Sequence, residues 1–341
     1  MPPRKKAAAT DSAETAPASE PKPAKKKNYP WKPSSRDSSE KDVLTLLPEH
    51  PESPASKTHK IGIHTSTSGG VQTAAERAYR LGANTFQMFS SSPRMWKPYN
   101  LSRQQCDEMK ELRSKYGIEP LVIHVSYLVN LASQNEEFYQ KSIDAFRGEI
   151  ERGLALGAEY LVLHPGSYRG LTREQGLERA AAGIEKAVEG LDLTGACKFE
   201  ILIENTAGAE FSLGSSFEQV AELVERLRAH APVAACIDTC HTHVSGYDLV
   251  SDDGYTDTMR HLDETVGFKN VKVWHCNDAK AARGSKLDRH EHIGQGSIGT
   301  DVFRRLLNDP NFAHSAFIAE TPADEPLDEL RNLNALKALV A

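Results

Sequence analysis

Residues 233–243 read V-A-A-C-I-D-T-C-H-T-H, an apolar run that is followed by a carboxylate and then by an imidazole. The run does not alternate between apolar and polar residues, which is typical of a strand covered on both faces, as in a parallel sheet. Asp238 lies where this strand ends, and His241 is expected in the loop that follows. The stretch therefore predicts a buried strand that carries metal-ligand side chains at its C-terminal end.

The same pattern occurs five more times, because five other largely apolar runs end in His or Glu. They are residues 121–123 before His124, 161–163 before His164, 201–203 before Glu204, 271–274 before His275, and 317–319 before Glu320. One polar residue after a strand is an ordinary loop feature. Six in series predict strands that lie around one axis, because buried carboxylates and imidazoles are costly unless something pairs with them.

Short strands and amphipathic helices alternate from Lys60 to the end of the chain. Residues 61–64 and 85–89 are two further predicted strands, and apolar residues at helical spacing predict helices such as 71–81 and 217–227. Repeated strand-helix units indicate a parallel sheet with right-handed crossovers. Eight such units favour a closed α/β barrel over an open sheet, so residues 58–341 are predicted to form a single (β/α)8 TIM barrel with its active site at the C-terminal strand ends.

Residues 1–57 are predicted to be a disordered, basic and proline-rich tail. The first forty residues contain no Leu, Ile or Val and hold nine Lys and Arg against five Asp and Glu. The basic clusters at residues 4–6 and 25–27 resemble nuclear-import signals or nucleic-acid tethers, with a plain solvated tail as the alternative. The expected compartment is the nucleus. The mitochondrion is a second candidate, although acidic residues in the tail argue against a presequence.

The remaining residues are acidic, with 32 basic and 42 acidic side chains. A basic surface is the usual footprint of nucleic-acid binding, so composition alone argues against DNA or RNA as a partner. Divalent cations gathered in one cleft would reverse the sign of the local charge. The sequence has no apolar signal and no membrane-length segment, so we expect an intracellular protein without a membrane partner.

The five cysteines show no paired spacing, which indicates a reducing environment. Cys236, Cys240 and Cys276 lie beside predicted ligands, so a zinc-thiolate site is one interpretation. The preferred interpretation is that these side chains pack as small hydrophobic residues.

A long segment, residues 277–299, follows the seventh strand and adds an Asp-x-His pair to the candidate ligands. The nine candidates are His124, His164, His241, His275, His290, Glu204, Glu320, Asp238 and Asp288. Nitrogen and oxygen donors without thiolate suit zinc, with manganese as second choice, and a catalytic zinc takes about three protein ligands. The set therefore predicts three zinc ions per chain, and clustered divalent cations indicate hydrolysis of phosphate esters.

Seven motifs resemble those of the endonuclease IV family of AP endonucleases, in order along the chain from about Ile61 to the C-terminus. They are H-V-S-Y-L-V-N-L-A, L-H-P-G-S, I-E-N-T-A-G, C-I-D-T-C-H, N-D-A-K, D-R-H-E-H-I-G-Q-G and A-E-T-P. The resemblance implies a TIM barrel with three zinc ions that cuts duplex DNA 5′ to an abasic site and leaves a 3′-hydroxyl. We further expect removal of 3′-blocking groups, a role in base excision repair, and a monomeric enzyme.

The resemblance also implies how the ligands are divided among the ions. One zinc would bind His124, His164 and Glu204, a second would bind Glu204, Asp238, His275 and Glu320, and a third would bind His241, Asp288 and His290. Glu204 would then bridge two ions. Glu320 would help to orient or deprotonate the attacking water, so Glu204 and Glu320 are the predicted catalytic residues.

Predicted DNA contacts come from loops above the barrel. Arg94, in S-P-R-M-W, resembles the family arginine that inserts into the base stack, and Tyr127 resembles a minor-groove tyrosine. His64, which ends the first strand, and Arg289, which lies between two predicted ligands, complete the set.

Two residues depart from the family pattern. Val125 replaces an acidic residue that often follows the third-strand His, and Gln295 replaces a frequent Glu. Neither is a predicted ligand, so the departures concern the tuning of the site or the grip on DNA rather than the reaction.

Two other functions compete with this interpretation. A divalent-metal sugar isomerase or epimerase would share the barrel and the strand-end ligands, and fold alone does not separate the two. It would need one or two metals and no inserted arginine, so the third ligand set and the Arg94 loop favour the endonuclease. A DNA-damage-binding scaffold without catalysis is disfavoured because every expected ligand is present.

Overall fold

A computed structural model of the protein describes residues 42–195 and 198–341. The disordered tail and the basic clusters predicted within residues 1–41 lie outside the described residues. The barrel domain and the segment that leads into it are described below.

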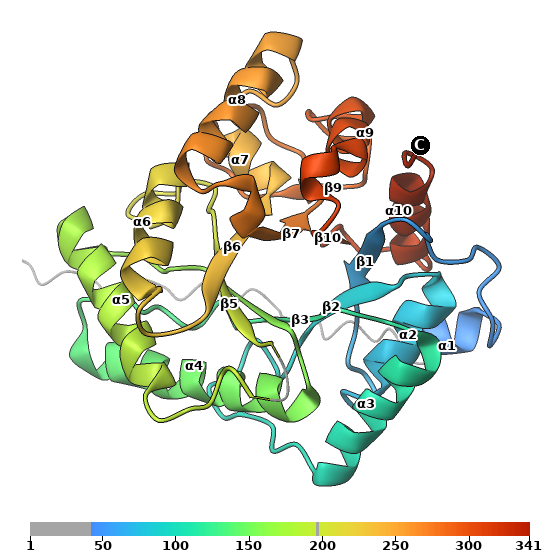
Figure 1. Ribbon diagram of the computed structural model, residues 1–341, viewed down its shortest axis with the longest axis horizontal. Helices are drawn as coiled ribbons and strands as arrows, with labels where there is room; N and C mark the ends of the chain where they lie inside the picture. The colour runs from blue at the N-terminus through green and yellow to red at the C-terminus, as the bar shows by residue number, and fades with distance from the viewer. Residues whose placement is uncertain (1–41, 196–197) are drawn as a thin grey trace, which may run out of the picture. The chain divides into compact units, whose positions relative to one another are not determined.

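Eight parallel strands close into a barrel in the order β1-β10-β7-β6-β5-β4-β3-β2, which confirms the predicted TIM barrel. Figure 1 shows the strands in the middle of the fold and the helices around them. The strands are β1 Lys60–His64, β2 Thr85–Phe89, β3 Leu121–His124, β4 Tyr160–Leu163, β5 Glu200–Glu204, β6 Val233–Asp238, β7 Val271–His275 and β10 Ala316–Ala319. The predicted strands agree with these bounds to within one residue.

The helices between the strands begin and end at the residues that the sequence provides for this. Ser102, Asn135 and Thr172 accept hydrogen bonds from first-turn backbone N–H groups, and Gly82 and Gly117 end two helices in the left-handed conformation. The α-helices are α1 Val43–Leu46, α2 Thr73–Leu81, α3 Arg103–Tyr116, α4 Glu136–Leu156, α5 Arg173–Val188, α6 Phe217–Leu227, α7 Thr239–Ser245, α8 Asp252–Thr265, α9 Thr300–Asn308 and α10 Asp328–Lys337. Short 3-10 helices are η1 Phe268–Asn270 and η2 Pro310–Phe312. Among the described residues, we find no helix with the length and apolarity needed to cross a bilayer.

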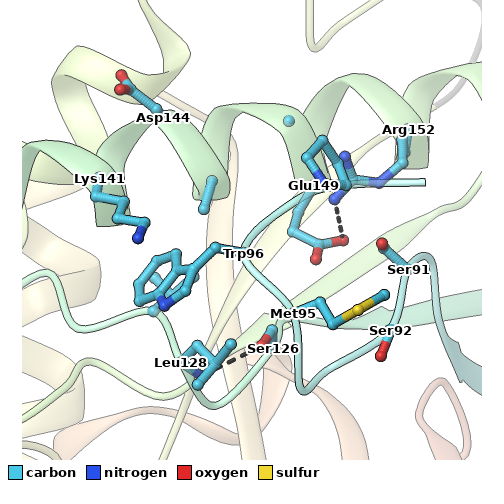
Figure 2. A pocket seen from close by; sticks show the side chains of 14 residues that line it. Ser91, Ser92, Met95, Trp96, Ser126, Leu128, Lys141, Asp144, Glu149 and Arg152 are labelled. Atoms are coloured by element: carbon cyan, nitrogen blue, oxygen red, sulfur yellow. Dashed lines mark hydrogen bonds and ion pairs between the residues drawn. The ribbon is translucent and has the colours of Figure 1, made fainter. Parts of the chain in front are cut away.

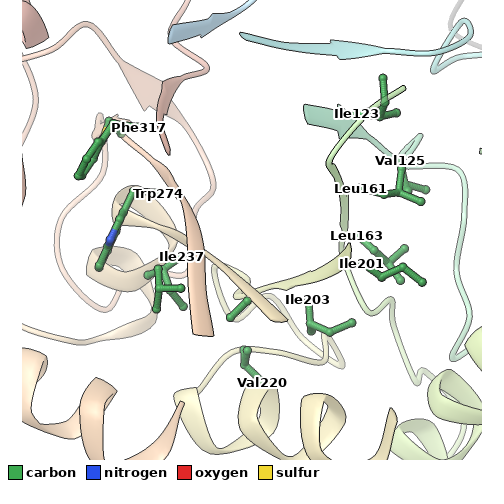
Figure 3. Close-up of a cluster of buried hydrophobic side chains, with 14 of the residues drawn as sticks. Ile123, Val125, Leu161, Leu163, Ile201, Ile203, Val220, Ile237, Trp274 and Phe317 are labelled. Carbon is green, nitrogen blue, oxygen red and sulfur yellow. The ribbon is translucent and has the colours of Figure 1, made fainter. Parts of the chain in front are cut away.

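The hydrophobic core has two layers that follow the alternation of side chains along each strand. Outward-facing residues such as Ile123, Leu161 and Ile203 form one cluster with buried helix residues, and Figure 3 shows Ile203 near Val220 of α6. The inner layer consists of Val122, Val162, Leu202, Ala234, Cys236, Val273, Ala316 and Ile318. Because side chains two positions apart share a face, the residue two positions after an inner-layer residue also points into the barrel. Six candidate ligands occupy such positions: His124, His164, Glu204, Asp238, His275 and Glu320.

Two elements beyond the strand ends differ from the prediction. His241 lies in the helix α7 and not in a loop, because the Asp238 carboxylate caps this helix by accepting from the His241 N–H at 2.7 Å. The segment 277–299 contains an antiparallel hairpin, β8 Asp278–Ala279 with β9 His290–Glu291. The hairpin strands are too short to show a periodicity, and the seven-residue helix α7 follows β6 without a break, so the apolar periodicity of the sequence indicated neither element.

The predicted boundary at residue 58 is wrong, because residues 42–57 pack on the barrel. Asp42 pairs with Arg77 of α2, whose side chain is buried, and Val43 joins the core. Lys337 Nζ donates to the backbone oxygen of Ser53 at 3.0 Å. The sequence D-V-L-T-L-L-P contains both a helix-capping residue and an apolar run, and these were overlooked beside the proline-rich segment.

We predict that a chain beginning at Asp42 keeps the stability of the full chain, whereas a chain beginning at residue 58 loses about 3 kcal/mol, because a buried Arg77 without its partner and a lost apolar contact are both costly. Urea unfolding of the two truncated proteins measures the difference. Equal midpoints would show that the packing of residues 42–57 adds nothing to stability.

Candidate metal centre

Among the described residues, five groups of side chains bring potential ligand atoms within 4.8 Å of one another, and three of these groups contain no cysteine. They are His124, His164 and Glu204; then Glu204, Asp238, His275 and Glu320; and then His241, Asp288 and His290. The groups coincide with the three zinc sites that the family resemblance implies. Their roles as zinc ligands remain predictions.

Glu204 lies at the middle of the centre and is fully buried. Its Oε2 lies 3.1 Å from His124 Nε2 and 2.8 Å from His164 Nε2. Its Oε1 lies 2.9 Å from His275 Nδ1. The two oxygens therefore face two different groups, which is the arrangement that a bridging carboxylate requires.

Backbone carbonyls fix the orientation of three imidazoles. His124 Nδ1 donates to Val125 O at 2.7 Å, and His241 Nδ1 donates to Asn205 O at 2.9 Å. His290 Nδ1 donates to the backbone oxygen of Glu320 at 2.9 Å. A carbonyl oxygen only accepts, so each Nδ1 carries a proton, and Nε2 is the nitrogen that each ring can offer to a metal. Val125 therefore supports His124 through its backbone, although it lacks the acidic side chain that is frequent in the family.

An independent observation supports a cation site at the third group. Asp288 Oδ2 lies 3.3 Å from His241 Nε2, and Asp288 Oδ1 lies 3.3 Å from His290 Nε2. Within the described part of the chain, His290 Nε2 is buried and has no hydrogen-bond partner. A buried nitrogen without a hydrogen-bond partner calls for an explanation, and a bound cation supplies one.

The charges of the centre show how strongly it attracts positive charge. Burial lowers the pKa of His124, but the Glu204 carboxylate outweighs this effect and raises that pKa to about 9. Burial likewise lowers the pKa of His290, and Asp288 outweighs it and raises that pKa to about 9. Burial raises the pKa of Glu204, yet His164 and His275 hold it well below its usual range. The carboxylates therefore favour positive charge on their neighbours, as a cation site does.

The two cysteines nearest the centre behave as core residues. Cys236 belongs to the inner layer of the barrel, and the Cys240 Sγ lies 3.8 Å from the Arg289 backbone oxygen. Burial is the main cause that raises the pKa of both thiols, and nearby carboxylates raise it further. Although Cys236 and Cys240 each lie in a group that could hold a metal, the neutral thiol is favoured, which supports the hydrophobic interpretation.

Asp278 organises the segment that carries His290, a role that the sequence analysis missed. It is fully buried, and its carboxylate oxygens accept from five backbone N–H groups, those of Ala279, Gly294, Gly296, Ile298 and Gly299. These bonds join both ends of the segment to one side chain. The sequence signal that could have indicated this role was an acidic residue, Asp278, followed later in the chain by a glycine-rich run at residues 294–299.

Three amide side chains at the centre were also missed. Asn277 Nδ2 donates to Asp238 Oδ2 at 2.6 Å, and its Oδ1 accepts from the Glu320 N–H at 2.7 Å. Asn205 Oδ1 accepts from the Asp238 N–H at 2.7 Å. The third amide is Gln87 of β2, a buried polar residue inside a predicted apolar strand, and that contrast was the signal for it.

The predicted DNA-contacting residues fall into two sets. Arg94, Tyr127 and Arg289 are exposed, and Tyr127 is 63% accessible. His64 instead lies inside the centre, with its Nδ1 3.7 Å from Glu320 Oε1. Gln295, the second departure from the family pattern, is exposed on the segment that Asp278 organises.

The loop that carries Arg94 is anchored on both sides of this residue. Ser126 Oγ donates to Pro93 O at 2.9 Å, and Lys141 Nζ lies 4.6 Å from the centre of the Trp96 ring. Figure 2 shows Trp96 beside Lys141 under helix α4, next to a cavity of about 240 Å³. None of the candidate metal ligands lines this cavity. It therefore belongs to the base of the Arg94 loop and not to the metal centre.

The closed barrel and the donor groups at its C-terminal end define the class, a TIM-barrel protein with a polar centre suited to cations. The family described as xylose isomerase-like TIM barrel matches residues 75–339. The crystal structure of a D-tagatose 3-epimerase-like protein, at 19% identity, covers 82% of this chain and 96% of its own with a TM-score of 0.61, which shows the fold alone.

Relatives with higher sequence identity show which family within this fold class the chain belongs to. The probable endonuclease 4 of Solibacter usitatus (strain Ellin6076) is 48% identical over 283 residues, which cover 82% of this chain and 96% of that protein. The crystal structure of endonuclease IV from Thermus thermophilus is 38% identical, with a TM-score of 0.72, and covers 82% of this chain and 98% of that one. The chain belongs to the endonuclease IV family of AP endonucleases, an enzyme family.

We predict that Gly296→Ala displaces the segment that carries His290, because a Cβ at this position would lie 2.4 Å from Asp278 Oδ1 and 2.5 Å from Ala279 O. The metal content of the protein should fall, and amide exchange over residues 288–299 should accelerate. The neighbouring exposed substitution Gln295→Ala is the matched control and should change neither. Unchanged exchange in the Gly296→Ala protein would contradict the role given to Asp278.

Proposed function

We propose that the protein is a zinc-dependent AP endonuclease of base excision repair. It hydrolyses the phosphodiester on the 5′ side of an abasic site in duplex DNA and leaves a 3′-hydroxyl. The observation that carries the proposal is the buried Glu204 carboxylate, whose two oxygens face two separate groups of candidate ligands. Zinc ions bound at the three groups would activate water and stabilise charge on the phosphate oxygens.

The charge of the centre suits a phosphodiester. The four carboxylates Glu204, Asp238, Asp288 and Glu320 give the three donor groups four negative charges when the imidazoles are neutral. Three divalent cations would leave the centre positive within an otherwise acidic protein. An anionic phosphodiester is therefore attracted to the centre and not to the rest of the surface.

The two predicted catalytic carboxylates differ in exposure, and this difference separates their roles. Glu204 is fully buried, whereas the Glu320 side chain is 17% exposed. Glu320 Oε2 lies 3.2 Å from His275 Nδ1, at the edge of the second group. Glu320 can therefore meet a water that enters from solvent and help to orient or deprotonate it, while Glu204 acts by holding its neighbours in place.

The substrate would bind in a cavity of about 290 Å³ that borders the donor groups. His164, His241 and Asp288 line it, and so does Tyr127, which lies at its exposed side. A deoxyribose phosphate without a base could enter this space at a low cost of unstacking, because an abasic site has already lost one partner of the stack. Arg94 would fill the gap that remains in the duplex.

Three further proposals follow from the same centre and the same chain. A 3′-blocking group is joined through a phosphoester, so it would be removed by the same groups. All nine candidate ligands lie in one chain, so a monomer is sufficient. The basic clusters at residues 4–6 and 25–27 support entry into the nucleus, with the mitochondrion as the second candidate.

We expect Glu204→Gln to reduce single-turnover cleavage of an abasic duplex by at least ~1000-fold, about 4 kcal/mol. A neutral amide offers one less negative charge between two cations, so zinc content should also fall. Glu200→Gln, at the opposite end of the same strand, is the matched control and should cleave like the parent.

The products decide the reaction class. A 3′ end that a polymerase extends directly indicates hydrolysis on the 5′ side of the abasic site. A Glu204→Gln protein that keeps a tenth of the parental rate, or a parent protein that cleaves after verified removal of zinc, would refute the proposed mechanism.

We also expect Arg94→Ala to weaken binding of an abasic duplex by about tenfold, roughly 1.4 kcal/mol, because an exposed guanidinium would no longer fill the gap in the stack. Lys97→Ala removes a positive charge from the same exposed loop and should weaken binding of abasic and undamaged duplexes to the same small extent. Binding titrations of all three proteins on both duplexes, with zinc content measured in parallel, make the comparison. If both substitutions weakened binding of the abasic duplex equally, Arg94 would contribute only its positive charge and would not insert into the base stack.

A further inference from the structure

Gln87 of β2 is a fully buried side chain at the metal centre, although β2 supplies none of the candidate ligands. Its Nε2 lies 2.6 Å from Glu320 Oε1 and 3.0 Å from His64 Nδ1. Its Oε1 lies 2.8 Å from His275 Nε2. Both N–H groups and the oxygen of the amide therefore have partners, so the side chain is held in a single orientation.

The chemistry of these partners fixes which atom of the amide faces which group. An ionised Glu320 carboxylate only accepts, so the NH2 group of Gln87 must face it. The amide oxygen then faces His275 and accepts from its Nε2–H. Nε2 of His275 therefore carries a proton, and Nδ1 is the nitrogen that faces the carboxylates, 2.9 Å from Glu204 Oε1 and 3.2 Å from Glu320 Oε2.

His275 differs in this respect from three other imidazoles of the centre. His124, His241 and His290 are oriented by backbone carbonyl oxygens, which no substitution removes. The orienting acceptor for His275 is a side chain from another strand. A single substitution at Gln87 can therefore release His275 and leave in place the carbonyl acceptors that orient these three rings.

We propose that Gln87 is a positioning residue for the second metal group, an inference that rests on the proposed zinc centre. Its oxygen sets the tautomer of His275, so that Nδ1 is the nitrogen available to a cation. Its NH2 group holds Glu320 Oε1, so that Oε2 is the oxygen available to the same cation. One amide thereby orients two of the four donors of this group.

The test measures the affinity of the protein for zinc, because a loss of cleavage activity alone would not show that metal binding has changed. Gln87→Met removes both hydrogen-bonding arms at similar volume, and competition with a chromophoric chelator should show one of three zinc ions bound roughly 10- to 100-fold more weakly. The matched control is Gln219→Met, which removes a buried amide that bonds Gly214 N at 2.9 Å and Ser215 Oγ at 3.3 Å. It should destabilise the fold to a similar extent and keep the parental affinity for all three ions.

A second variant separates the two arms and remains informative if Gln87→Met folds poorly. Gln87→Glu keeps an oxygen that faces His275 and replaces the N–H that faces Glu320 by a carboxyl oxygen, which repels Glu320 Oε1, so its zinc affinity should lie between those of the parent and Gln87→Met. Equal affinity in the Glu and Met variants would overturn the His275 half of the proposal. Parental affinity in Gln87→Met would overturn all of it. A parent protein that fails to bind three ions would count against the proposed zinc centre and not against Gln87.

Discussion

The strict alternation of side chains along a strand is the constraint on which this structure depends. In six strands the same residue parity that fills the barrel with Val, Leu, Ile, Ala and Cys continues by two positions to the candidate ligands. Leu202 and Glu204 illustrate the rule, because the first packs inside the barrel and the second lies at the middle of the centre. A slip of one residue would turn every such ligand toward the helices, so the apolar packing and the metal centre enforce the same register.

Burying the charged side chains of the centre costs free energy, and several kinds of contact offset this cost in turn. Carboxylates such as Glu204 and Asp238 are fully buried, which is unfavourable unless they are paired. Imidazoles and amides supply the first compensation, and the amides of Asn277 and Gln87 reach carboxylates that imidazoles alone do not satisfy. Cations would supply the rest, so binding of metal and stability of the fold are coupled at this end of the barrel.

The sequence predicted those parts of the molecule that depend on local patterns. The eight strands and the positions of the six strand-end candidate ligands follow from apolar runs that stop at a polar residue, and the structure has these strands to within one residue. The hairpin β8–β9 was not predicted, because strands of two residues have no periodicity. Gln87 and Asp278 were not predicted, because their roles depend on partners that are remote in sequence. Residues 42–57 were assigned to the tail because the composition of the preceding residues obscured a short capped helix.

The third donor group is the part of the centre that the strand ends do not supply. Strand ends alone supply the first two groups, and any barrel of this fold has strand ends that point to one centre. His241 comes from α7, whereas Asp288 and His290 come from the segment that Asp278 holds in place. A sugar isomerase has no use for this addition, whereas a phosphodiester has several oxygens that develop charge and need stabilising. The choice of chemistry therefore lies in a short capped helix and one glycine-rich segment, and the barrel provides the frame on which both are positioned.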